Sequence, residues 1–218
     1  MERVRRLQRE LLDSASPEQA ETNLRDLARI NRWFGGHRTL LRLLRNLAGP
    51  NESFTVLDVG AGSGDMGRSI HSRFPQARVT SLDRYGHHLL RATPPRVTAD
   101  AFRLPFRPAA FDFVLCSSLL HHFPDREAAE LISTLRPLAR RALIVLDLER
   151  HPLAYRFLPL TRWLLRWTHM TVHDGCISVA AAFRPTELQD LANRAGIAPV
   201  RLRTHRPWFR ISLIVPAE

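Results

Sequence analysis

The chain has 218 residues, 44% of them hydrophobic and 24% charged, which indicates a globular protein able to bury one sizeable core. Its formal net charge is +11, but it contains no lysine and its arginines are scattered, which disfavours the basic patch of a nucleic-acid-binding protein. Two cysteines exclude a disulfide framework, and the lack of a signal peptide or of an apolar stretch of roughly 20 residues leads us to expect a cytoplasmic protein.

The first 50 residues are predicted to form a helical cap, residues 1–50, ahead of a single domain at 51–218. The segment Ser16-Pro17-Glu18 is typical of a helix start. Residues 31–36 are expected to break that helix, after which leucines recur at helical spacing. The helices expected in the cap are 2–13, 17–30 and 37–47.

From residue 54 onwards, short apolar segments alternate with helical patterns, which is typical of a parallel sheet covered by helices on both faces. The expected strands are 54–59, 78–82, 96–98, 111–116 and 142–148. The expected helices are 65–74, 86–92, 126–138 and 185–195. Two alternating segments follow, 200–204 and 210–215, and their short connection predicts a hairpin rather than another crossover.

Residues 150–182 are too many for a plain connection between a strand and a helix. Their part from 153 to 170 is rich in Leu, Trp and Arg and is expected to form a helix. Because this insert leaves the sheet at the carboxyl ends of the strands, where ligands bind, we interpret it as a lid over a substrate. Two alternatives stay open: packing against the sheet edge, and contact with a membrane surface. The residues that would suit a membrane surface are Arg162, Trp163, Arg166 and Trp167.

The most informative segment is 56–64, Val-Leu-Asp-Val-Gly-Ala-Gly-Ser-Gly, an apolar strand that carries one acid and ends in three glycines. Glycines allow a sharp turn and the close approach of a ligand, and the helix that follows offers free N–H groups. This pattern indicates a nucleotide-type cofactor. A dinucleotide motif counted from Gly62 would begin two residues after the strand has ended at Gly60, and it would leave Asp58 without a role.

Two further acids follow in order. Asp83 closes the next strand, where its two carboxylate oxygens can accept from both hydroxyls of a ribose, and Asp100 follows the third strand. In order and spacing these motifs resemble those of the class I S-adenosylmethionine-dependent methyltransferases of the small-molecule type, similar to the ubiquinone and menaquinone methyltransferases. The resemblance covers residues 54–149 closely. It implies an α/β fold, a three-layer Rossmann-like sheet of seven strands with the last antiparallel.

The resemblance also implies S-adenosylmethionine as the cofactor and S-adenosylhomocysteine as its product. Asp83 would bind the ribose, Asp100 the adenine amino group, and Cys116 and Ser117 would lie near the methionine part. The residues assigned to cofactor binding are Asp58, Gly60, Ala61, Gly62, Gly64, Asp83, Arg84, Asp100, Ala101, Cys116, Ser117 and Arg32.

Methyl transfer to a hydroxyl or a carbon acid requires removal of a proton, a task that suits histidine. His121 and His122 follow the strand that carries the family's catalytic loop, and His173 lies in the lid, so these three are the candidate catalytic residues. For His121 and His122 a structural role is the favoured alternative. No metal site is expected, because Asp147 and Glu149 have no third ligand beside them.

Together these features predict an enzyme that transfers a methyl group to a small organic acceptor, namely a phenolic or enolic oxygen, or an activated carbon, of a secondary metabolite. The loop 116–119 lacks the Asn/Asp-Pro-Pro-aromatic motif of enzymes that methylate exocyclic nitrogens, which disfavours nucleic acid as the acceptor. Two alternatives stay open. One is an RNA methyltransferase, which would bind RNA in a salt-dependent manner, and the other is a scaffold that binds the cofactor without turnover.

Overall fold

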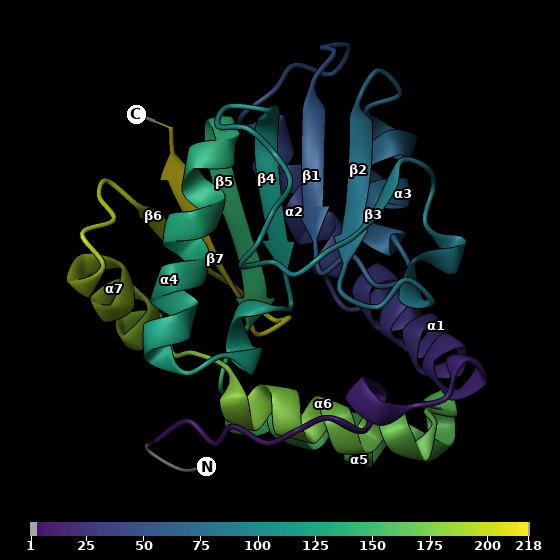
Figure 1. Ribbon diagram of the computed structural model, residues 1–218. Coiled ribbons are helices and arrows are strands. Elements are labelled where there is room, and N and C mark those ends of the chain that lie inside the picture. Colours follow the sequence, from purple (N-terminus) through teal and green to yellow (C-terminus); the bar gives the residue numbers. More distant parts are fainter. Residues whose placement is uncertain (1–3, 218) are drawn as a thin grey trace.

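A seven-stranded sheet in the order β3-β2-β1-β4-β5-β7-β6 forms the centre of the computed structural model, which describes residues 4–217 (Figure 1). β1 to β5 are parallel, and β7 runs antiparallel to both of its neighbours, β5 and β6. The strands are β1 (Thr55–Val59), β2 (Arg78–Asp83), β3 (Arg96–Thr98), β4 (Phe111–Ser117), β5 (Ala139–Leu148), β6 (Arg201–His205) and β7 (Arg210–Pro216). The expected α/β fold, with its terminal hairpin and reversed last strand, is confirmed.

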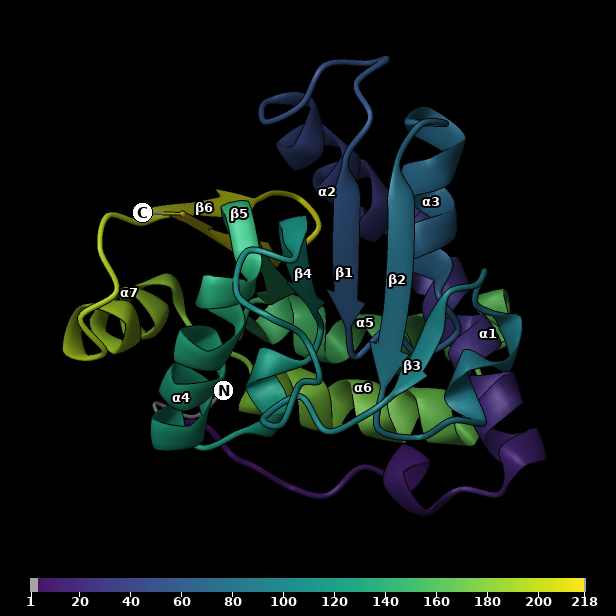
Figure 2. The same ribbon diagram turned by 45° about the horizontal axis from the view of Figure 1, so that its top comes forward.

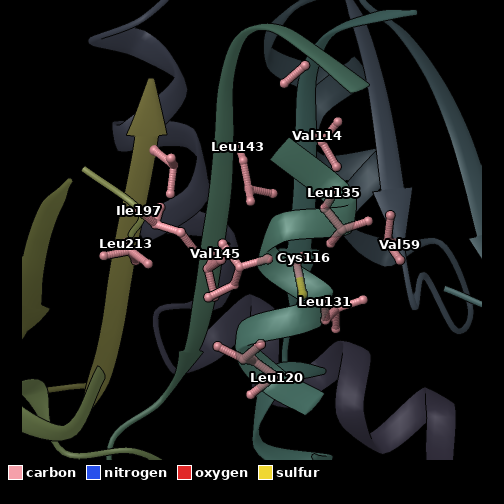
Figure 3. Close-up of a cluster of buried hydrophobic side chains, with 14 of the residues drawn as sticks. Val59, Val114, Cys116, Leu120, Leu131, Leu135, Leu143, Val145, Ile197 and Leu213 are labelled. Atoms are coloured by element: carbon pink, nitrogen blue, oxygen red, sulfur yellow. The ribbon is translucent and has the colours of Figure 1, made fainter. Parts of the chain in front are cut away.

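Helices cover both faces of the sheet and enclose two hydrophobic cores. On one face, α2 (Gly36–Arg45) and α3 (Asp65–Arg73) bury leucine, isoleucine and methionine side chains against the central strands. On the other face, α4 (Asp125–Leu135) and α7 (Pro185–Arg194) cover the cluster in which Cys116 lies (Figure 3). Burial on both faces explains why the central strands are apolar throughout rather than alternating.

The N-terminal segment differs from the helix expected at 2–13, of which residues 2 and 3 lie outside the described part of the chain. Residues 4–10 are not helical, and only the short 3-10 turn η1 (Leu11–Ser14) follows them. Contacts with the insert replace helical hydrogen bonds: the amide of Arg6 donates to α6, and two amides of η1 donate to the carboxylate of Asp174. We call residues 4–14 the N-terminal strap.

The following helix, α1 (Pro17–Trp33), begins where expected, because Ser16 and Gln19 cap it reciprocally through their side chains and amides. It continues past the expected break and ends only before Gly35, whose φ of 83° makes the turn into α2. The helix expected at 86–92 is a single 3-10 turn, η2 (His88–Arg91).

Two helices fill the insert where one was expected. They are α5 (Pro152–Leu165) and α6 (His169–Ala181), and Arg166 separates them with a left-handed φ of 56°. Both lie across the carboxyl ends of the parallel strands, next to the N-terminal strap (Figures 1 and 2). Within residues 4–217, none of the helices combines the length and the apolar character that crossing a membrane requires.

Candidate active site

A cavity of about 1050 Å³ lies at the carboxyl ends of the parallel strands, lined by the sheet edge, α1, α5, α6 and the N-terminal strap. Typical ligand pockets measure roughly 300–1,000 Å³, so this cavity has room for a nucleotide-sized cofactor and a small second molecule. Among the described residues, all but one of the buried side-chain polar atoms without a hydrogen-bond partner belong to residues that line it. They are Asn23 Oδ1, Asp58 Oδ2, Ser63 Oγ, His88 Nε2, Ser117 Oγ, His121 Nε2 and Arg210 Nη1. Since buried polar groups are nearly always paired, these atoms indicate a site that binds polar ligands.

The glycine turn after β1 forms one wall of the cavity. Gly60, Gly62 and Gly64 all have left-handed φ angles, 72°, 51° and 70°, which glycine adopts without a steric penalty. A Cβ at Gly64 would lie only 2.6 Å from the Cβ of Ala92. The backbone geometry of the turn therefore explains the glycine spacing.

Replacing Gly64 with alanine should destabilise the fold more than the same change at Gly196. Both have positive φ, 70° and 65°, which costs alanine about 1–2 kcal/mol. Only at Gly64 would the new Cβ also meet Ala92, whereas nothing lies within 4 Å of it at Gly196. We expect the free energy of unfolding of Gly64→Ala to fall about 1–3 kcal/mol further, measured by urea denaturation. Equal losses in the two variants would contradict a tightly fitted turn.

Asp83 connects the end of β2 to the glycine turn. Its Oδ2 accepts from the amide of Gly62 at 2.9 Å, and its Oδ1 accepts from the amide of Tyr85 at 3.0 Å. Burial would raise the pKa of Asp83, but hydrogen bonds from His88 and from the two amides outweigh it and hold that pKa below its usual value. The carboxylate is therefore ionised and faces the cavity.

Asp58 and Ser117, at the ends of β1 and β4, also face the cavity, each with an unpartnered oxygen. Burial, reinforced by the charges of Asp65 and Asp83, raises the pKa of Asp58 to about 8. Asp100 lines the cavity from the loop after β3. The other cavity-lining residues assigned from the sequence are Gly60, Ala61, Gly62, Arg84 and Ala101.

Across the cavity, His121 in the 3-10 turn η3 (Leu120–His122) forms a buried ion pair with Asp147 on β5. Its Nδ1 lies 2.6 Å from Oδ1 of Asp147, and its amide donates to Oδ2. Its Nε2 has no hydrogen-bond partner and lies 3.9 Å from Oε1 of Glu10. Burial opposes a charge on the ring, but the two carboxylates outweigh it and raise the pKa of His121 to about 10. The ring is therefore an imidazolium at neutral pH.

Stability should fall as the pH rises from neutrality to above 10. The folded-state pKa of His121, about 10, exceeds its ordinary value of 6.5, so its contribution is complete below pH 6.5 and is lost as the pH passes 10. The melting temperature of the wild type and of His121→Asn, followed from pH 6 to 10.5, measures this effect. We expect the difference in melting temperature between the two proteins to become smaller as the pH rises. A constant difference would contradict the assigned ion pair.

Glu10, His121 and His122 also bring ligand atoms within 4.8 Å of one another, a spacing that metal centres show. His122 stacks on His121 with ring centroids 4.3 Å apart, and burial and the neighbouring charge lower its pKa. Each ring nitrogen of His121 lies near a carboxylate, Nδ1 at 2.6 Å from Asp147 and Nε2 at 3.9 Å from Glu10. We therefore interpret the grouping as an ion-pair network.

Four of the residues assigned from the sequence do not line the cavity, and one of them is Gly64 of the glycine turn. Arg32 is exposed near the end of α1, and Cys116 is buried in the core, where burial raises the pKa of its thiol (Figure 3). His173 is exposed on α6, with its Nδ1 2.9 Å from Asp174. Successive helical residues point in different directions, so Asp174 faces the cavity and His173 does not. The structure thus gives no support to His173 as the base.

Glu10 and Arg210 are among the cavity residues that the sequence analysis did not anticipate. Glu10 comes from a segment expected to be helical, and no local pattern marks it. Arg210 begins β7, and because β7 is reversed its first residue arrives at the carboxyl edge of the parallel strands. The predicted hairpin therefore carried the one signal that could have placed Arg210 at the site.

Comparison with known proteins agrees with this geometry. Residues 56–141 match the family described as a methyltransferase domain. The malonyl-[acyl-carrier protein] O-methyltransferase of Dechloromonas aromatica is 31% identical over 206 residues, which cover 90% of this chain and 71% of that protein. The ubiquinone biosynthesis O-methyltransferase of Nitrosomonas europaea is 27% identical over 171 residues, which cover 72% of this chain and 69% of that protein.

The fold is likewise similar to that of a solved SAM-dependent methyltransferase from Aquifex aeolicus. The TM-score is 0.63 at 14% sequence identity, over 94% of this chain and 100% of that chain. The cavity fits the cofactor of such enzymes, because unpartnered oxygens and a ribose-compatible carboxylate line it. The chain therefore belongs to the class I S-adenosylmethionine-dependent methyltransferases, and it is an enzyme of the small-molecule type.

Proposed function

We propose that this enzyme methylates a phenolic or enolic oxygen of a small, largely apolar acceptor. The observation that carries the proposal is the buried His121, held by Asp147 through Nδ1, whose Nε2 belongs to a cavity-lining residue and forms no hydrogen bond, with Glu10 at 3.9 Å. Apolar side chains from the N-terminal strap, α5 and α6 wall much of the remaining space, which suits an aromatic molecule with one polar group. Both cysteines are free, which fits a cytoplasmic enzyme.

The cofactor would lie along the carboxyl edge of the sheet from β2 towards β4. Its ribose hydroxyls would bind Asp83, its adenine would lie beside Asp100, and its methionine part would lie near Gly60 and Ser117. The unpartnered oxygens of Ser117 and Asp58 support this placement, since both lie in the same cavity as Asp83.

Bound S-adenosylmethionine supplies a methyl group on a positively charged sulfur, which is already electrophilic. The protein therefore has to orient the acceptor oxygen, exclude water and favour the anionic form of that oxygen. The Nε2–H of His121 donates to this oxygen and stabilises its negative charge in a site of low dielectric constant. Asp147 fixes the orientation of the ring through Nδ1. Because His121 already carries its proton, the acceptor's proton passes to solvent before the transfer.

Binding of S-adenosylmethionine at pH 7 should release a proton from Asp58. With a pKa of about 8, this carboxyl is mostly protonated in the free protein. The ammonium and sulfonium charges of the ligand favour the ionised carboxylate. Calorimetric titration in buffers of different ionisation enthalpy measures the release, and Asp58→Asn should abolish it. A wild type that releases no proton would show that Asp58 does not sense these charges.

The proposed acceptor class is tested with purified enzyme, S-adenosylmethionine and matched aromatic compounds that carry a phenol, an enol, a carboxylic acid or an amine. We expect S-adenosylhomocysteine to form with the phenol and the enol, and mass spectrometry with NMR to place the methyl group on oxygen. Methylation at carbon, or only of the acid or the amine, would replace the oxygen assignment. Methylation of RNA alone would overturn the small acceptor altogether.

A further inference from the structure

Arg210 is a buried arginine without an ionic partner. It begins β7, is only 2% exposed, and forms no salt bridge with any carboxylate among the described residues. Its Nε donates to the carbonyl of Phe34 at 3.4 Å and its Nη2 donates to Oδ1 of Asn31 at 2.9 Å, whereas Nη1 has no partner. Burying an unpaired charge is energetically unfavourable. Because Arg210 lines the cavity and its Nη1 is a free donor, this atom is suited to bind an anionic group of a ligand.

The side chain of Arg210 is fixed to the glycine turn through one amide. Nδ2 of Asn31 donates to Oδ2 of Asp65 at 3.1 Å, and Nε2 of His37 lies 2.8 Å from the same oxygen. Asp65 is the first residue of α3, directly after Gly64. The side-chain amide of Asn31 thus separates the carboxylate of Asp65 from the guanidinium of Arg210, so this carboxylate compensates the positive charge only in part.

The position of Arg210 also identifies the end of the ligand that it meets. Strand order places β2 and Asp83 on one side of β1, and β4, β5 and β7 on the other (Figure 1). A cofactor whose ribose lies at Asp83 therefore extends its amino-acid end towards the side of Arg210. We propose that Nη1 of Arg210 binds the methionine carboxylate of S-adenosylmethionine.

The test compares two ligands that differ at the amino-acid end. S-adenosylhomocysteine carries the carboxylate, and 5′-methylthioadenosine lacks the whole amino-acid part. We expect Arg210→Gln to lower the affinity for S-adenosylhomocysteine roughly 10- to 100-fold, the effect of losing a hydrogen bond between charged groups. The affinity for methylthioadenosine should stay within twofold of the wild-type value. Arg210→Lys should restore part of the affinity. Isothermal titration calorimetry gives the dissociation constants, and Arg203→Gln, which changes an exposed arginine in the same hairpin, is the matched control.

Three outcomes would overturn the assignment. Equal weakening of both ligands would show that Arg210 only supports the fold of the cavity. Unchanged S-adenosylhomocysteine affinity with a raised KM for the acceptor would place the anion on the acceptor instead. If Arg210→Gln does not fold, the wild type alone tests the proposal with the decarboxylated analogue of S-adenosylhomocysteine. This analogue should bind the wild type at least roughly tenfold more weakly than S-adenosylhomocysteine does. Equal affinity for the two ligands would be the third contradicting outcome.

A second, independent feature is the outward face of α5, which we define as Leu153, Arg156, Leu160, Trp163 and Leu164. These residues follow one another at helical spacing, and Leu160, Trp163 and Leu164 are 77%, 86% and 81% exposed. The segment 152–168 contains three arginines and no acid. Large exposed apolar side chains flanked only by positive charge are complementary to an anionic lipid surface.

The outward face of α5 also borders the cavity, because Leu153 and Leu160 line it while remaining exposed. We infer that α5 docks on an anionic membrane surface, so that a lipophilic acceptor enters the cavity from the lipid. This inference concerns delivery of the acceptor and would stand even if the methylated group were not an oxygen. An acidic protein partner is the competing occupant, and the exposed tryptophan and leucines favour lipid.

Co-sedimentation with vesicles tests the docking. The wild type should bind vesicles that contain phosphatidylglycerol, bind pure phosphatidylcholine more weakly, and lose binding at high salt. The double variant Trp163→Ala/Leu164→Ser should bind roughly tenfold more weakly, and Leu90→Ser, which removes an exposed leucine from η2, should bind like the wild type. Absence of vesicle binding, or equal binding of all variants, would overturn the inference. Self-association of the wild type that the double variant abolishes would also overturn it, because the outward face of α5 would then bind a second copy of the chain.

Discussion

Asp83→Ala should bind S-adenosylhomocysteine about 10- to 150-fold more weakly than the wild type, because a hydrogen bond to a charged group contributes about 1.5–3 kcal/mol. Each oxygen of Asp83 already accepts one amide, that of Gly62 or that of Tyr85. A carboxylate has about four acceptor sites, and Nδ1 of His88 also lies 3.4 Å from Oδ1, so Oδ2 keeps one site for a ribose hydroxyl. The substitution therefore removes the ribose partner and loosens the glycine turn at the same time. Isothermal titration calorimetry measures the loss.

Asp112→Ala is the matched control for this experiment. Asp112 lies at the other end of the sheet, where its Oδ2 accepts from the amide of Thr55 at 2.8 Å. Its loss should lower the melting temperature but leave the affinity for S-adenosylhomocysteine unchanged. If Asp83→Ala binds as tightly as Asp112→Ala, the ribose does not lie at the end of β2.

His121→Asn should lower kcat about 10²- to 10³-fold, the effect of removing one donor to a developing or bound oxyanion. The affinity for S-adenosylhomocysteine should stay within twofold, because Nε2 faces the acceptor and not the cofactor in the proposed arrangement. Rates with a phenolic acceptor and calorimetry with the product separate the two effects.

The pH profile distinguishes this role from a structural one. With a phenol of pKa near 10, kcat/KM of the wild type should rise with pH and fall again once His121 loses its proton, whereas His121→Asn should show no such fall. His173→Gln is the control and should retain full activity, since His173 is exposed outside the cavity. Full activity of His121→Asn would return attention to His122.

The sheet and the glycine turn at its carboxyl edge could be predicted because their signals are local. The turn of Gly60 to Gly64 follows from φ angles that only glycine adopts freely, and it leaves its mark within one short segment. Asp83 reaches Gly62 because β1 and β2 are adjacent parallel strands whose carboxyl ends meet at one edge. Once alternation predicted the parallel sheet, the position of these residues followed.

The acceptor side could not be predicted in the same way, since it is assembled from segments far apart in the chain. Glu10 meets His121 only because the N-terminal strap is extended along α6, a conformation set by tertiary hydrogen bonds that override helix propensity. In α6, polar and apolar residues are mixed around the helix, so its sequence does not reveal that Asp174 rather than His173 faces inward.

Arg5 connects the N-terminal strap by hydrogen bonds to the loop that carries His121 and to the end of α6. Its Nε donates to the carbonyl of Ala181, and its Nη2 donates to the carbonyls of His121 and Phe123. Ala217, in contrast, is bonded to Arg141 near the start of β5, at the far end of the sheet. An immobilisation handle or fusion partner joined after Ala217 therefore leaves the loop that carries His121 undisturbed. One joined ahead of the N-terminal strap pulls on Arg5, which is hydrogen-bonded to that loop.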